Sequence, residues 1–204
     1  NGAQRVELCS HWECGGLTPL ESDIRSAVQE GLPVYALIRP RAGHFTYDEA
    51  EWQRMTHQIE ASLSAGASRV VVGALDQRGR FELERIRKWV ELFGGHRLVI
   101  HRALDASNRW DADAQALRTL GIYRILSSGG EAQAWDGRQR IDQLMEWGFD
   151  VTVASGVRPD QKEDWLKRGV RNFHASCRVE ESLPVRHFDG STFPVASEHV
   201  RAWF

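Results

Sequence analysis

The sequence is poor in cysteine, with only Cys9, Cys14 and Cys177 among its 204 residues. Three thiols cannot all pair with one another, and small secreted proteins that depend on disulfides carry a much higher share of cysteine. We therefore expect free thiols and a reducing compartment, the cytoplasm.

Long hydrophobic runs and a dominant sign of charge are also absent. The longest apolar runs have the length of a β-strand, well below the roughly 18 residues of a membrane span. The 26 Lys and Arg residues are mixed along the chain with 28 Asp and Glu residues, which gives a net charge of −2. We therefore expect neither a membrane nor a nucleic acid as a partner.

A repeated junction is the main feature that the sequence does have. A glycine followed by an apolar residue, one or two polar residues and a β-branched run occurs at Gly2, Gly31, Gly66, Gly121, Gly148 and Gly169, with a looser copy at Gly95. Glycine suits the left-handed position that ends a helix, and continuous Val, Ile and Leu runs are typical of strands buried on both faces. The pattern predicts strands alternating with helices, and hence a parallel sheet.

Seven strands are predicted from this pattern. They cover Arg5–Cys9, Val34–Arg39, Arg69–Leu75, Leu98–Leu104, Tyr123–Ser127, Asp150–Ala154 and Arg171–Ser176. We expect a single domain over residues 1–204, an α/β fold of the TIM-type (β/α)8 barrel, with an irregular tail over residues 181–204 that holds at most a short helix. A regular barrel has eight strands, so we expect the first strand to lie upstream of residue 1.

Several segments at the predicted strand ends are uncommon in combination. They are Gly2–Cys9, Ile38–Arg41, His101–Asp105 and Phe173–Ser176, which read GAQRVELC, IRPR, HRALD and FHAS. In this order and spacing they resemble the CutC family of copper homeostasis proteins, over most of the chain. The resemblance implies a cytoplasmic β/α barrel associated with copper handling, and a first strand upstream that usually contains a cysteine.

Copper binding has candidate ligands of its own in the sequence. Cu(I) prefers thiolates and thioethers and accepts imidazole. Cys9, His11 and Cys14 lie within six residues after the first predicted strand, while His174 and Cys177 lie near the end of the last. We predict Cys9 and Cys14 as the metal ligands, with Cu(I) as the metal, although a buried cysteine more often serves as a small apolar filler.

The alternative function is a barrel enzyme, an isomerase, lyase or hydrolase, that acts on an anionic small molecule. Polar residues gather at the carboxyl ends of the strands, where barrel enzymes place their sites. Residues two apart in a strand share a face, so Glu7 would accompany Cys9, and His101 would accompany Asp105. The candidate acid–base residues are Glu7, His101, Asp105 and His174. The candidate anion-binding residues are Arg39, Arg41, Arg102, Ser128, Gly129, Ser155, Gly156 and Ser176.

Each of these residues also has a structural explanation. Glu7 with Arg39, or Asp105 with Arg102, would make a buried ion pair that fills the top of the barrel. A single buried histidine usually forms a hydrogen bond within the core, and a binding or scaffold protein without turnover is a third reading. The concentration of polar residues on one face nevertheless favours a functional cavity. A homo-oligomer is compatible with the fold, but the sequence identifies no interface.

Overall fold

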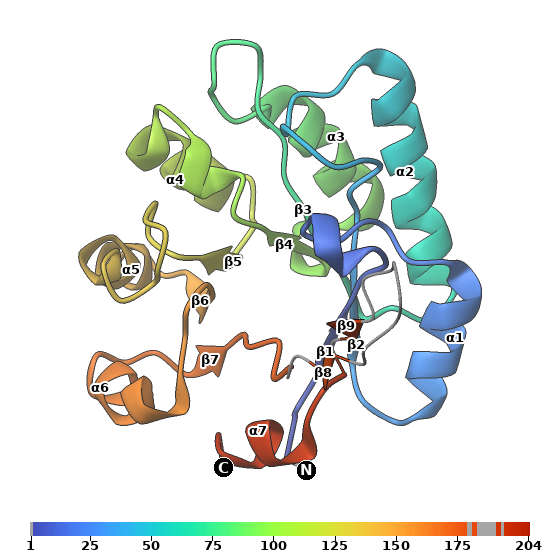
Figure 1. The fold of residues 1–204 in the computed structure, drawn as a ribbon. Coiled ribbons are helices and arrows are strands. Elements are labelled where there is room, and N and C mark those ends of the chain that lie inside the picture. The colour runs from blue at the N-terminus through green and yellow to red at the C-terminus, as the bar shows by residue number, and fades with distance from the viewer. Residues whose placement is uncertain (1, 179–180, 183–190, 193) are drawn as a thin grey trace.

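A computed structural model describes residues 2–178, 181–182, 191–192 and 194–204. Seven parallel strands form one sheet in chain order, and the sheet curls into a half-barrel (Figure 1). The strands are β1 Val6–Leu8, β2 Val34–Leu37, β3 Arg69–Val72, β4 Leu98–Ile100, β5 Arg124–Ser127, β6 Asp150–Val153 and β7 Asn172–Phe173. The predicted seven-stranded α/β barrel-type fold is thus confirmed.

The main helices lie on the outer side of the curled sheet (Figure 1). They are α1 Glu21–Gln29, α2 Glu49–Ser64, α3 Leu83–Phe93, α4 Trp110–Thr119, α5 Arg138–Glu146 and α6 Lys162–Lys167. Short 3-10 turns cover η1 Trp12–Cys14, η2 Gly95–Arg97, η3 Leu104–Ala106 and η4 Pro159–Gln161. None of the helices in the described ranges is long and apolar enough to cross a membrane.

The main core lies between the sheet and these helices. Side chains such as Ile59 of α2, Ile86 of α3 and Trp165 of α6 are fully buried there. The predicted junctions have the expected backbone, because Gly31 after α1 has a φ of 83° and Gly169 after α6 has a φ of 95°. Glycine adopts this left-handed conformation without strain, so each helix can turn directly into the next buried strand.

All seven strands of the sheet are shorter than the sequence predicts, and β4 is the most informative. It ends at Ile100, where the chain leaves the sheet, and η3 begins at Leu104. The backbone N–H of Ala103 donates to Nδ1 of His101 over 3.0 Å, which closes a tight turn. In the sequence, the apolar residues of the HRALD segment continue the pattern of a buried strand, although the chain has already left the sheet there. The expected shared strand face of His101 and Asp105 is therefore wrong.

The tail over residues 181–204 was predicted to be irregular with at most a short helix; the short helix is present, and two short strands were not predicted. Its described residues form two short antiparallel strands, β8 Glu181–Ser182 and β9 Ser191–Thr192, followed by the short helix α7 Ser197–Arg201. Trp203, just after α7, is 8% exposed and its ring lies 5.4 Å from that of Phe173. The end of the chain is thereby held against β7.

Side chains join β1 to β7, the two edge strands of the curled sheet. Arg5 donates from Nη1 to Oδ1 of Asn172 over 2.9 Å and from Nη2 to Oγ1 of Thr152 over 3.0 Å. Among the described residues, no backbone ladder joins these two strands. The predicted eighth strand stays a prediction.

Candidate functional site

The carboxyl ends of the strands surround a cavity of about 810 Å³. Its wall comes from several strand ends and from the residues that follow them, as expected for a parallel barrel. The predicted site residues that line it are Glu7, Cys14, Arg39, His101, Arg102, Ser155, Gly156, His174 and Ser176. The structure thus brings most of the predicted site to one cavity.

Glu7 and His174 form the pair best placed for acid–base chemistry. Glu7 lies in β1 and His174 follows β7, so the pair joins the two edges of the sheet. Nδ1 of His174 lies 3.4 Å from Oε2 of Glu7, and the two side chains are 38% and 20% exposed. A carboxylate beside an imidazole can pass a proton to or from a molecule in the cavity.

His101 lies in the cavity wall but is poorly suited to acid–base catalysis at neutral pH. Its residue is only 6% exposed, and its ring lies 5.0 Å from the ring of Phe45. Burial, assisted by the positive charge of Arg39, lowers the pKa of His101 to about 3. The imidazole is therefore neutral at pH 7, and we do not retain His101 as a proton donor or acceptor.

The buried neutral state of His101 predicts a loss of stability in acid. The folded state resists a proton that the unfolded chain takes up below a pKa of about 6.5, so the free energy of unfolding falls as pH falls through that value. At pH 4.5 the His101 contribution should be about 2–3 kcal/mol less favourable than at pH 7.5. Urea denaturation of the wild type and of His101→Asn at both pH values measures it. Parallel pH profiles for the two proteins would contradict this expectation.

The guanidinium of Arg39 holds two loops in place and is not free to bind a ligand through two parallel N–H groups. The residue is 9% exposed. Its Nη1 donates to the carbonyl oxygens of Cys14 and Gly16 over 2.9 and 3.1 Å, and its Nη2 donates to that of Gly43 over 3.0 Å. The guanidinium joins the loop after β1 to the loop after β2, and its charge remains next to the cavity.

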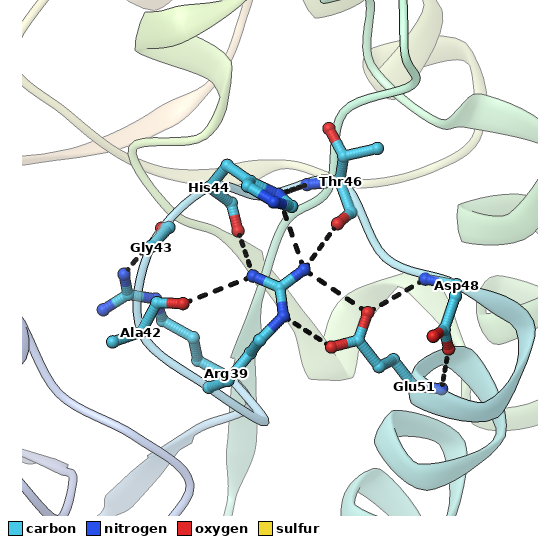
Figure 2. A network of polar contacts seen from close by, with 8 residues as sticks. Arg39, Ala42, Gly43, His44, Thr46, Asp48 and Glu51 are labelled. Atoms are coloured by element: carbon cyan, nitrogen blue, oxygen red, sulfur yellow. Dashed lines mark hydrogen bonds and ion pairs between the residues drawn. The ribbon is translucent and has the colours of Figure 1, made fainter.

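Arg41 was predicted to bind an anion, but it turns into the loop that precedes α2. Its Nε lies 2.5 Å from Oε1 of Glu51, and its amino groups donate to the carbonyl oxygens of Thr46 and His44 over 2.7 and 3.0 Å. Figure 2 shows the labelled partners of this network, including Asp48, the N-cap of α2, which bonds with Glu51. These contacts give Arg41 a structural role in the loop.

Asp105 holds the loop after β5 in place through hydrogen bonds. Its side chain is 6% exposed. Oδ1 accepts from the Ser127 hydroxyl and the Gly130 N–H over 2.5 and 3.2 Å. Oδ2 accepts from the N–H and hydroxyl of Ser128 over 2.8 and 2.9 Å. Ser128 is fully buried and Gly129 packs on the backbone of Gly137, so this predicted catalytic and binding group supports the loop instead of facing the ligand.

Arg102 is the predicted arginine with the most freedom to bind a ligand. Its side chain is 40% exposed at the cavity. Nε donates to Asp105 over 3.2 Å, and Nη2 donates to the Ser128 hydroxyl and the Glu131 carbonyl over 3.1 and 3.3 Å. Within the described part of the chain, none of these contacts uses Nη1. A carboxylate or phosphate in the cavity would find a fixed guanidinium with a donor to spare.

Two loops after β6 and β7 contribute backbone at the cavity. Ser155 has a φ of 78° and Gly156 has a φ of 63°, while the carbonyl of Ser155 is held by the N–H of Ala134 over 3.0 Å. Cys177, next to Ser176, has a φ of 52°. Left-handed backbone at a residue other than glycine costs about 1–2 kcal/mol, and such strain clusters at binding and active sites.

The three thiols do not form a ready copper site. Burial and the charge of Glu7 raise the pKa of Cys9, and burial raises the pKa of Cys177. The Cys14 thiol lies 3.0 Å from the carbonyl oxygen of His11. The described residues contain no cluster of three or more His, Cys, Asp or Glu side chains arranged to hold a metal ion. The predicted ligands therefore do not fit a preformed thiolate site, and copper binding stays a prediction.

Sequence reasoning missed several residues of the cavity wall, among them Arg178, His199 and Trp203. Arg178 lies with its guanidinium carbon 4.2 Å from the centroid of the Trp12 ring, and His199 and Trp203 come from the tail. Lys162 of α6 donates to the carbonyl of Trp203 and helps to hold the tail in place. The tail has too little periodicity to predict this placement, although its tryptophan was a signal of burial.

Comparison with known proteins agrees with the resemblance seen in the sequence. The CutC family model matches residues 1–179. The chain is 33% identical over 190 residues to the family protein CutC of Pectobacterium atrosepticum, with coverage of 92% of this chain and 75% of the relative. It is 37% identical over 183 residues to that of Xanthomonas campestris pv. campestris, with coverage of 87% and 76%.

Solved structures share the fold. One is described as the "Putative Copper Homeostasis Protein CutC from Streptococcus agalactiae", with a TM-score of 0.77, 28% identity, and coverage of 84% of this chain and 87% of that one. A second, described as a native KDPGal structure, has a TM-score of 0.57 at 15% identity and covers 99% and 80% of the two chains. The second likeness concerns the fold alone.

Proposed function

Because this chain belongs to the CutC family, we propose for it a function centred on the cavity at the carboxyl ends of the strands. The cavity binds a small molecule that carries a carboxylate or a phosphate, and Glu7 and His174 transfer a proton to or from it. The observation that carries this proposal is the meeting of Arg102 with the Glu7–His174 pair in one cavity.

Charge at the cavity supports an anionic ligand. Arg102 and Arg178 both line it, and Arg39 adds a third positive charge from the wall. Arginine binds carboxylate and phosphate through two parallel N–H groups, which fixes the orientation of the anion as well as its position. Because Arg102 is itself held by Asp105 and Ser128, it loses little side-chain entropy when it binds.

The chemistry that the pair supports is acid–base catalysis, of the kind used by isomerases, lyases and hydrolases. Glu7 and His174 are both partly exposed to the cavity, so a bound molecule can reach them. A binding protein without turnover would need the arginines but not this pair.

Replacement of Arg102 by alanine tests the anion site. We expect the affinity for 2-phosphoglycolate, measured by isothermal titration calorimetry, to fall at least tenfold, since a hydrogen bond to a charged group contributes about 1.5–3 kcal/mol. Arg87→Ala is the matched control, because Arg87 is an exposed residue of α3. Urea denaturation checks that both variants remain folded. Equal affinity of Arg102→Ala and the wild type would overturn the proposal.

Handling of Cu(I) is a second candidate function. The relative from Streptococcus agalactiae is described as a copper homeostasis protein. In this chain, burial first of all raises the pKa of Cys9, and the nearby Cys14 adds to that rise. Cu(I) would be the cargo of a site at Cys9 and Cys14 and would have to displace a thiol proton there, which makes binding weaker at lower pH.

A competition titration separates this candidate from the first. If Cys9 and Cys14 hold Cu(I), the reduced protein should take one equivalent from bicinchoninate, and the double variant Cys9→Ser with Cys14→Ser should take none. Cys177→Ser is the matched control, since it removes a thiol whose pKa is also raised by burial. Uptake no greater than that of an unrelated protein with three thiols would exclude direct copper binding.

A further inference from the structure

We infer that His101 is a fixed, uncharged hydrogen-bond donor that offers its Nε2–H to a carbonyl or carboxylate oxygen of the molecule in the cavity. The inference deepens the proposed function and rests on it, since it adds an oxygen acceptor to the anionic ligand class. It also gives His101 a role other than proton transfer.

The proton of His101 is placed by the backbone of the following turn. The N–H of Ala103 donates to Nδ1 of His101 over 3.0 Å. A ring nitrogen that accepts a hydrogen bond carries no proton, so in the neutral ring the proton lies on Nε2. The turn that ends β4 therefore leaves a donor, and not an acceptor, at the far side of the ring.

That donor has no acceptor within the part of the chain that the structure describes. Nε2 of His101 is buried and has no hydrogen-bond partner among the described residues. His101 lines the cavity together with Arg39 and Phe45, so the ring is part of the cavity wall. A buried N–H without an acceptor is costly, and an oxygen atom of a ligand would remove that cost when it binds.

The ring is held in position by its neighbours. A Cβ atom on Gly73, at the end of β3, would lie 2.7 Å from Nδ1 and Cε1 of the ring and 3.0 Å from Cβ of Ala103. The absence of a side chain at position 73 therefore makes room for the imidazole, and Phe45 packs beside it. Because Nε2 is covered in this structure, an oxygen atom of a ligand reaches it only after a neighbouring side chain of the wall shifts.

The charge state of the ring suits this role. Burial and the nearby Arg39 guanidinium hold the pKa of His101 at about 3, so the ring is neutral near pH 7. A neutral imidazole donates a hydrogen bond without giving up its proton. It would polarise a carbonyl, or orient a carboxylate, while Arg102 holds the anionic group of the same molecule.

Two substitutions of His101 test the roles of its two ring nitrogens separately. Asparagine places an oxygen near the position of Nδ1 and can still accept from Ala103, but it has no atom at the position of Nε2. Glutamine reaches the position of Nε2 with an amide N–H₂. We expect His101→Asn to bind 2-phosphoglycolate about five- to tenfold more weakly than the wild type, and His101→Gln to recover part of that loss.

Inorganic phosphate serves as the second probe, because it reports the anion site without a carboxylate. We expect both variants to bind phosphate within twofold of the wild type, and ¹⁵N NMR of the histidines to show an Nε2-protonated His101 whose proton shifts with 2-phosphoglycolate. Wild-type affinity in His101→Asn, or a proton on Nδ1, would overturn the inference while leaving the anion site intact. If neither probe binds the wild type, the proposed function itself fails, and the inference fails with it.

Discussion

Replacement of Asp105 by alanine is expected to lower the free energy of unfolding by about 3–5 kcal/mol, the range observed when one partner of a buried charged network is removed. The Asp105 carboxylate is 6% exposed. It accepts four hydrogen bonds from the loop after β5 and a fifth from Arg102. The variant takes the carboxylate acceptor from the buried Ser127 hydroxyl and the Ser128 N–H, and urea denaturation near neutral pH measures the loss.

Asp160→Ala is the matched control for this prediction. Asp160 is 72% exposed and lies 3.5 Å from Arg158, so its loss should change the free energy of unfolding by less than about 1 kcal/mol. Asp105→Asn keeps the shape but not the charge and should fall between the two. A loss below about 1 kcal/mol in Asp105→Ala would show that the carboxylate does not support the loop, and would return it to the set of catalytic candidates.

Replacement of Gly129 by alanine is expected to cost about 2–5 kcal/mol for a steric reason. Gly129 has a φ of 68°, which an alanine adopts at a cost of about 1–2 kcal/mol. The added Cβ would also overlap the carbonyl oxygen of Gly137, and forced overpacking costs a further 1–3 kcal/mol or so. Thermal and urea denaturation both measure this loss.

Gly31→Ala isolates the backbone part of that cost. Gly31 has a φ of 83° and no atom within 4 Å of an added Cβ, so its variant should lose only about 1–2 kcal/mol. The difference between the two variants measures how tightly the loop after β5 packs on the start of α5. If Gly129→Ala and Gly31→Ala lowered the free energy of unfolding equally, Gly129 would not pack on Gly137. The predicted contact of Gly129 with a ligand would then regain support.

The fold could be predicted from the sequence because its signals are local. A glycine such as Gly31 or Gly169 ends a helix through its own backbone conformation, and the following apolar run needs only to be buried on both faces. The helices follow from apolar residues at helical spacing, as in α2, where Trp52, Met55 and Ile59 are buried. The ends of the strands were less predictable, because the turn after Ile100 depends on a backbone contact to one side chain.

The sequence predicted which residues would line the candidate site better than it predicted what each of them does there. Strand order places Glu7 and His174 in one cavity, and their contact follows from the curl of the sheet. Arg39 and Arg41 were predicted to bind a ligand, but their partners are carbonyl oxygens of loops whose path no sequence pattern shows. His199 and Trp203 reach the cavity through a tail without periodicity.

Other predictions stay open to experiment. They are the location in the cytoplasm, the homo-oligomer and the eighth strand between β7 and β1. The last of these matters for the site, because Glu7 and His174 meet at that side of the sheet. A strand paired with β1 would fix the position of Glu7 more firmly than the Arg5 contacts do.

The central claim is that the cavity at the strand carboxyl ends is an anion site. A crystal structure of the protein grown with 2-phosphoglycolate tests it most directly. We expect electron density for the ligand in the cavity, with one anionic group bound by Arg102 and an oxygen within hydrogen-bonding distance of His101. A ligand bound only outside the cavity, or a cavity that stays empty at saturating ligand, would contradict the claim.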